Sequence, residues 1–116
     1  MRRDSHYLED IRVAADQIRL FITGMRLQDF LDDTKTRAAV ERQLITMGEA
    51  ANRVSGPFKE QHTDIPWSRL IQIRNFYVHG YDRLGAEDVW GTAKRLIPRV
   101  ARMIAPLIPT EEDTFE

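Results

Sequence analysis

The sequence predicts an all-α protein built as a bundle of four helices. Apolar residues recur every three or four positions over four long stretches, which is the period of one helix face. No stretch alternates between apolar and polar residues for long enough to predict a strand. Most of the six glycines and five prolines fall where these helical stretches begin or end.

The first helix is expected over about residues 5–23, with Gly24 as its stop. A short turn then leads to Asp33 and Thr34, either of which suits the cap of a second helix over about 35–54. This second helix carries a bundle seam in which apolar residues alternate at steps of four and three. A Ser-Gly-Pro sequence at 55–57 is expected to end it.

A polar link is expected over 58–64, followed by a third helix that starts near 65–67 and reaches about 79–80. Asp64 is the expected cap of the third helix. The fourth helix is expected to start after Gly85 and to be kinked at Pro98, because proline cannot donate a backbone hydrogen bond.

The length of 116 residues predicts one domain, which we expect to span 1–109, with a flexible acidic tail at 110–116. A chain of this size buries only about two-thirds of its unfolded surface. A helix face buried against a second subunit would therefore add stability. We expect a dimer.

The composition excludes several kinds of site. The net charge of -1 argues against a generally basic surface, so contacts with RNA would need a local cluster of basic residues. The absence of cysteine excludes disulfides and thiolate metal sites, and the three scattered histidines have no zinc-ligand spacing, so no metal or cofactor is expected. No signal peptide or membrane-spanning run is evident, and we expect a cytoplasmic protein.

Arg74 is the first candidate site residue. On a helix, Trp67, Leu70, Tyr77 and Val78 fall on one side, with Arg74 in the middle of them. A guanidinium there is costly unless it is paired or faces a cleft, because it cannot lose its charge. Taken alone, such a residue is more often a buried structural arginine than a catalytic one.

His79 and Asn75 add to this candidate site. On a continuous helix His79 points about 140° away from Arg74, but Gly80 offers a reason for the helix to end and the chain to turn. Asn75 lies four residues before His79, a spacing that lets an amide orient an imidazole. A lone histidine near a helix end is usually a capping or surface residue. The combination with Arg74, Asn75 and Tyr81 favours catalysis.

Arg74, His79 and Tyr81 have the spacing Arg-x4-His-x-Tyr, which resembles the motif of HepT-like toxins in the HEPN superfamily. The resemblance extends from about Tyr7 to Leu107. It includes a Met-Gly-Glu-Ala stretch at 47–50, Ile-Pro-Trp at 65–67 and a tryptophan early in the last helix, Trp90.

The resemblance implies a HEPN-type helical bundle that dimerises and brings two copies of the motif into one cleft. It implies a toxin of a toxin–antitoxin pair that cleaves RNA without a metal. Arg74 would stabilise charge on the phosphate, His79 would act as general acid or base, and Asn75 would orient the site.

The resemblance also implies a partner, a minimal nucleotidyltransferase antitoxin that adds AMP to Tyr81 and thereby blocks the cleft. From the residue alone, Tyr81 is also consistent with a packing tyrosine whose hydroxyl lies at the surface.

Basic residues outside the motif give weaker indications. Arg69 and Arg83 are possible RNA contacts, and the last helix carries a basic row that is more typical of a solvated face: Lys94, Arg95, Arg99 and Arg102. The alternative to a ribonuclease is a non-catalytic HEPN module that binds nucleotide or RNA, or that partners a nucleotidyltransferase. A plain dimerisation domain is disfavoured, because it needs neither Arg74 nor His79.

Overall fold

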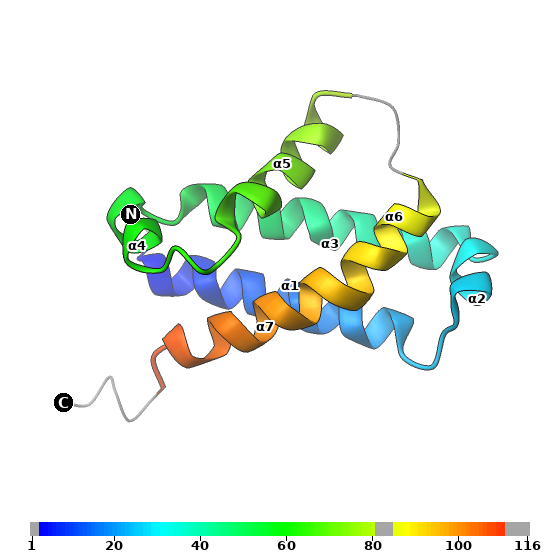
Figure 1. Cartoon of the computed structure of the whole chain (residues 1–116), viewed down its shortest axis with the longest axis horizontal. Helices are drawn as coiled ribbons and strands as arrows, with labels where there is room; N and C mark the ends of the chain where they lie inside the picture. Colours follow the sequence, from blue (N-terminus) through cyan, green and yellow to red (C-terminus); the bar gives the residue numbers. More distant parts are fainter. Residues whose placement is uncertain (1–2, 81–84, 111–116) are drawn as a thin grey trace.

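The computed structural model of the chain describes residues 3–80 and 85–110. Within these ranges every regular element is a helix, which confirms the all-α prediction (Figure 1). Tyr81, Arg83 and residues 111–116 of the acidic tail lie outside the described residues. Across the described ranges, no helix is long and apolar enough to cross a membrane.

The two longest helices, α1 (Asp4–Ile22) and α3 (Thr34–Arg53), pack along each other and agree closely with the predicted ranges. Gly24 has a positive φ of 77°, a backbone conformation that glycine adopts without strain, and so ends α1 as predicted. Of the two candidate caps of α3, Asp33 serves: its side chain accepts the Thr36 backbone N–H at 2.9 Å.

Two short helices lie in the connections. The turn predicted after Gly24 contains α2 (Leu27–Leu31). The predicted polar link over 58–64 is wrong in its first half, where the chain forms α4 (Gly56–Gln61). The Ser55 hydroxyl caps α4 by accepting the Phe58 N–H at 3.3 Å, and proline is tolerated in a first helical turn. The Ser-Gly-Pro sequence therefore both follows α3 and starts α4.

The helix that carries the motif is α5 (Trp67–Val78). Its predicted cap, Asp64, is wrong: Pro66 occupies the cap position, and its carbonyl accepts the Leu70 N–H at 3.2 Å. Asp64 lies too early in the chain to reach the first turn. At the other end, His79 is the C-terminal cap and Gly80 has a φ of 71°, so the predicted end of the helix is confirmed.

The predicted fourth helix consists of α6 (Ala86–Gly91), a π-helical stretch η1 (Thr92–Leu96), α7 (Ile97–Ile104) and a final 3₁₀ turn η2 (Ala105–Leu107). The irregularity that was predicted as a kink at Pro98 is this π-helical stretch, in which the Ile97 N–H bonds to the Thr92 carbonyl five residues earlier. A proline ring crowds the carbonyl four residues before it, and a wider turn relieves that crowding.

The core is apolar throughout the described part of the chain, with no buried polar or charged residue. Helix α1 packs against α3 and α7, whereas α5 packs against α3 (Figure 1). The ring of Phe30 on α2 lies 5.3 Å from that of Trp90 on α6, which fastens the short helix to the last one. The largest fully buried side chains are Phe30, Leu8, Ile11, Ile18, Leu44, Met47, Leu70, Ile97 and Ile104.

The contact between α3 and α5 is closest at Gly48. A Cβ added to Gly48 would lie 2.2 Å from the Cβ of Arg74 and 2.6 Å from the Leu70 carbonyl oxygen. The obstacles are backbone and the base of a side chain, which cannot swing away. Gly48 therefore sets how near the motif helix lies to α3.

Replacing Gly48 with alanine is expected to push α5 away from α3 and to lower the free energy of unfolding by about 1–3 kcal/mol, the usual cost of overpacking. This loss should appear although alanine is the better helix former. Urea denaturation measures it. The neighbouring exposed Glu49→Ala variant is the control and should change stability by less than about 0.5 kcal/mol. Equal stability of Gly48→Ala and the wild type would contradict the close contact.

Candidate active site

Four of the six predicted site residues are described, and all four belong to the helix α5 or its cap: Arg69, Arg74, Asn75 and His79. The other two, Tyr81 and Arg83, lie outside the described residues. All of the described candidate site residues therefore lie on one short helix or its C-terminal cap.

Arg74 is half-buried, and its Cβ stands at the contact with Gly48. Its Nη1 donates a hydrogen bond to Asn75 Oδ1 at 2.9 Å. Its Nε is buried and has no hydrogen-bond partner among the described residues. A buried N–H without a partner costs about 1–3 kcal/mol, so the guanidinium is held in place by packing more than by pairing.

This arrangement limits how Arg74 can bind an anion. A guanidinium has five N–H donors in a planar fork. The Nε side of the fork is covered by the protein, and one Nη1 hydrogen points at Asn75. The remaining donors lie at the end of the fork, where Nη1 and Nη2 can hold two oxygens of one phosphate.

His79 is exposed at the end of α5, where its backbone N–H still bonds to the Asn75 carbonyl at 3.0 Å. The helical path therefore continues through His79, and the turn occurs only at Gly80. His79 accordingly stays about 140° around the helix axis from Arg74. The end of the helix does not bring the two side chains to the same side.

Asn75 lies between the other two motif residues. Its side chain was predicted to orient the His79 imidazole, and the structure places its Oδ1 on the Arg74 guanidinium. The backbone carbonyl of Asn75 also accepts a hydrogen bond from the His79 backbone N–H. Asn75 thus fixes Arg74 directly.

The predicted apolar side of α5 is right near its start and wrong at its end. Trp67 and Leu70 are buried, but Val78 is 49% exposed. Past Arg74 the helix extends beyond the apolar part of its contact with α3, and polar groups take over there.

A polar network that the sequence did not predict joins α5 to α3. The Tyr77 hydroxyl donates to Glu41 Oε2 at 2.7 Å, and Glu41 Oε1 lies 3.5 Å from Arg37 Nε. Burial, and then the hydrogen bond to Glu41, raise the pKa of Tyr77 well above its ordinary value. Arg37 and Glu41 have helical pair spacing, but nothing in the sequence connects Glu41 with Tyr77, 36 residues away.

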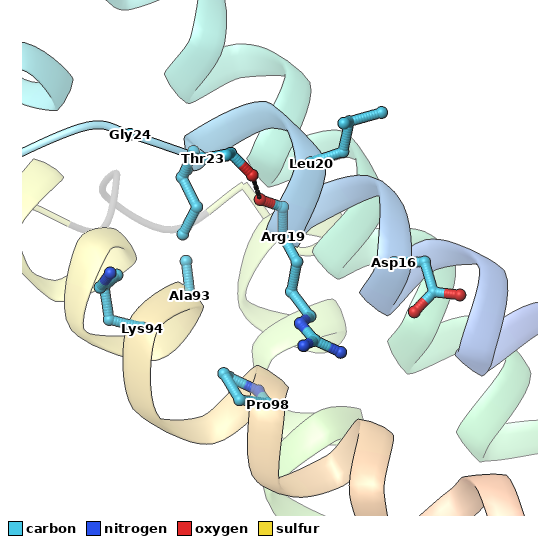
Figure 2. A pocket seen from close by; sticks show the side chains of 9 residues that line it. Asp16, Arg19, Leu20, Thr23, Gly24, Ala93, Lys94 and Pro98 are labelled. Atoms are coloured by element: carbon cyan, nitrogen blue, oxygen red, sulfur yellow. Dashed lines mark hydrogen bonds between the residues drawn. The ribbon is translucent and has the colours of Figure 1, made fainter.

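Two surface grooves flank η1. The first, of about 480 Å³, lies between α5 and the α6–η1 segment; Arg69, Gln72 and Phe76 line one wall, and Arg95 belongs to the other. The second, of about 380 Å³, lies between α1 and η1, with Arg19 and Lys94 on opposite sides near Pro98 (Figure 2). The predicted basic row is therefore divided, because the adjacent Lys94 and Arg95 line different grooves. Within the residues that are described, no three His, Asp or Glu side chains gather as metal ligands.

The link between Tyr77 and Glu41 predicts a pH dependence of stability. Because the folded protein raises the pKa of Tyr77 above 10, its stabilising effect is complete below about pH 10 and declines as the pH rises beyond it. Tyr77→Phe should lower the free energy of unfolding at pH 7 by about 1 kcal/mol and remove this alkaline decline. Urea denaturation at several pH values measures both effects. An unchanged alkaline decline in Tyr77→Phe would refute the prediction.

Comparison with known proteins assigns the family. The family model described as "Ribonuclease HepT-like" matches residues 11–107. A protein of Thermococcus cleftensis named "Probable ribonuclease HepT" is 37% identical over 97 residues, which cover 84% of this chain and 88% of that protein. A "Putative RNase" of Caldanaerobacter subterraneus is 25% identical over 97% of this chain and all of the relative. One of Methanocaldococcus jannaschii is 26% identical over 84% of this chain and 90% of the relative. No solved structure matches the chain.

The matched region contains α3, α5, the contact at Gly48 and the whole motif. The chain belongs to the HepT-like ribonuclease family.

Proposed function

We propose that this ribonuclease is the toxin of a toxin–antitoxin pair and that it cleaves RNA through Arg74 and His79, without a metal ion. The observation that supports this most is the state of Arg74. The guanidinium is half-buried, and its Nε has no partner among the described residues, which is costly for a helical bundle but suits a group that binds a phosphate through Nη1 and Nη2.

In the proposed reaction the ribose 2′-hydroxyl attacks the adjacent phosphorus and the 5′-oxygen leaves. A 2′,3′-cyclic phosphate and a 5′-hydroxyl end result. One general base takes the 2′ proton and one general acid gives a proton to the leaving oxygen, so the protons balance. His79 serves in one of these roles. Arg74 binds the phosphate oxygens as their negative charge increases, and the hydrogen bond to Asn75 holds the guanidinium in its orientation.

We further propose a HEPN-type homodimer in which each cleft takes Arg74 from one subunit and His79 from the other. Within one subunit the two side chains differ by about 140° around α5, and the helix turns only after His79. A two-fold axis beside this helix would place Arg74 of one subunit near His79 of the other, an arrangement that one subunit alone does not provide.

In the cell, we propose, the partner is a minimal nucleotidyltransferase antitoxin that transfers AMP from ATP to Tyr81. The tyrosyl oxygen would attack the α-phosphorus, releasing pyrophosphate and the hydroxyl proton. The added phosphate, two residues from His79 in sequence, would occupy the cleft and repel RNA.

Single variants test the catalytic assignment. His79→Ala should lower the cleavage rate of single-stranded RNA by about 10²–10⁴-fold, because a general acid or base is lost. Arg74→Ala should lower it by about 10²–10³-fold, and Arg74→Lys should recover only part, since lysine lacks the fork. Gel analysis of the products, including the cyclic phosphate end, measures this. The exposed His6→Ala and Arg42→Ala are matched controls expected to keep full activity. An inactive wild type would favour a non-catalytic binding module, and active variants would refute the site.

Mixing the two inactive variants tests the shared cleft. In a heterodimer of Arg74→Ala with His79→Ala, one of the two clefts contains both intact residues, so the mixture should recover up to about one quarter of the wild-type rate. If both residues of a cleft came from the same subunit, the mixture would remain inactive. That result would refute the proposed division.

Co-expression with a minimal nucleotidyltransferase tests the role of Tyr81. Intact-mass measurement should show one or more added AMP units on the wild type and on Tyr77→Phe, and none on Tyr81→Phe. Modified protein should lose RNA cleavage, because phosphate charge enters the cleft. Modification of Tyr81→Phe would contradict the proposed site.

A further inference from the structure

We propose that the groove between α5 and the α6–η1 segment is a nucleotide-binding subsite for single-stranded RNA, and that it prefers cytosine to uracil. This rests on the proposed ribonuclease activity and deepens it. The observation is the placement of two arginines, one aromatic ring and two carboxylates around one groove of about 480 Å³, whose α5 wall ends at Phe76, three residues before His79.

The wall formed by α5 continues to the motif. Arg69, Gln72 and Phe76 lie within about 60° of one another around the helix axis, and His79 follows Phe76 by three residues on the same stripe. From Arg69 to His79 the helix rises about 15 Å, the span of a few nucleotides. An RNA strand bound along this wall reaches His79 without crossing the packed face of α5.

The opposite wall holds Arg95 in the groove. A Cβ added to the buried Gly91 would lie 2.6 Å from Nη2 of Arg95, so the guanidinium rests in the space that this glycine leaves. Glycine inside a helix costs about 1 kcal/mol relative to alanine. Gly91 therefore lowers helix stability but leaves room for the Arg95 guanidinium, which can bind a phosphate oxygen.

The two ends of the groove differ in chemistry. Helices α5 and α6 are consecutive and run in opposite directions (Figure 1), so Phe76 lies towards Glu87 and Asp88, whereas Arg69 lies towards Arg95. The end with the two arginines attracts the phosphates of the RNA backbone. The carboxylates would repel a phosphate, but they accept hydrogen bonds from an exocyclic amino group while the base stacks on Phe76.

This arrangement gives the base preference. Cytosine presents an amino group where uracil presents a carbonyl oxygen, so Glu87 and Asp88 favour the former. The groove of Figure 2 lacks this combination: it holds Arg19, Lys94 and Asp16, and no aromatic ring lines it.

Fluorescence anisotropy with labelled oligocytidylate tests the phosphate end, in the full-length His79→Ala protein so that the probe survives. Arg69→Ala and Arg95→Ala should each weaken binding about fivefold. Together they should reduce the slope of log affinity against log salt by about 1.4, since each phosphate contact on a single strand contributes about 0.7. Lys94→Ala is the matched control and should bind as its parent does.

Gly91→Ala separates binding from folding. The added methyl displaces the Arg95 guanidinium, so affinity should fall towards that of Arg95→Ala while the free energy of unfolding stays equal or rises. If Arg95→Ala and Gly91→Ala bind oligocytidylate as tightly as Lys94→Ala, the subsite is refuted, and cleavage by the wild type would still support the ribonuclease mechanism.

Labelled oligouridylate tests the base end. It should bind several-fold more weakly than oligocytidylate, and Glu87→Gln with Asp88→Asn should remove most of that difference. Equal binding of the two probes would overturn the base preference. If the wild type cleaves neither probe but the groove variants alter binding, the proposed activity fails while the subsite remains.

Discussion

The contact of α3 with α5 at Gly48 determines where the candidate active-site residues of α5 lie. The two backbones meet there with no space for a methyl group, and the Cβ of Arg74 rests against the glycine. One turn further along, the Tyr77–Glu41 hydrogen bond fixes the same pair of helices. An apolar seam alone allows a helix to slide or rotate, whereas a close backbone contact next to a polar link allows only one register. The direction of Arg74 therefore depends on α3.

Because the register is fixed, α5 has two distinct faces, one packed against α3 and one that lines the groove beside α6. The face towards α3 carries Leu70, Arg74 and Tyr77, and the face towards α6 carries Arg69 and Phe76. His79 continues the second face, because the helical path persists to the cap. A site that uses Arg74 and His79 together must reach around the helix. This geometry is the reason for proposing a cleft that a second copy completes.

Local sequence features predicted the helices well but did not predict the contacts between distant segments. Periodicity, Gly24 and the Asp33 cap gave α1 and α3 nearly residue by residue, and Gly80 gave the end of α5. Helix α4 was missed because Gly56 and Pro57 usually interrupt helices, although Ser55 can cap one. The motif supplied the candidate residues. The roles of Gly48 and Glu41 depend on which helix lies beside them, and no local pattern contains that information.

The departures from ideal helix design lie around α5. A glycine inside α6, a π-helical turn beside Pro98 and an Arg74 Nε without a partner among the described residues each cost stability that alanine, a regular helix or an apolar side chain would have kept. In a protein selected only to fold, such costs would be scattered. Here each lies in α5 or in the segment that borders it, and two of the three lie at an arginine: the Nε of Arg74, and Gly91 at Arg95. Stability has been given up where positive charge is placed, which is the requirement of a protein that binds a polyanion.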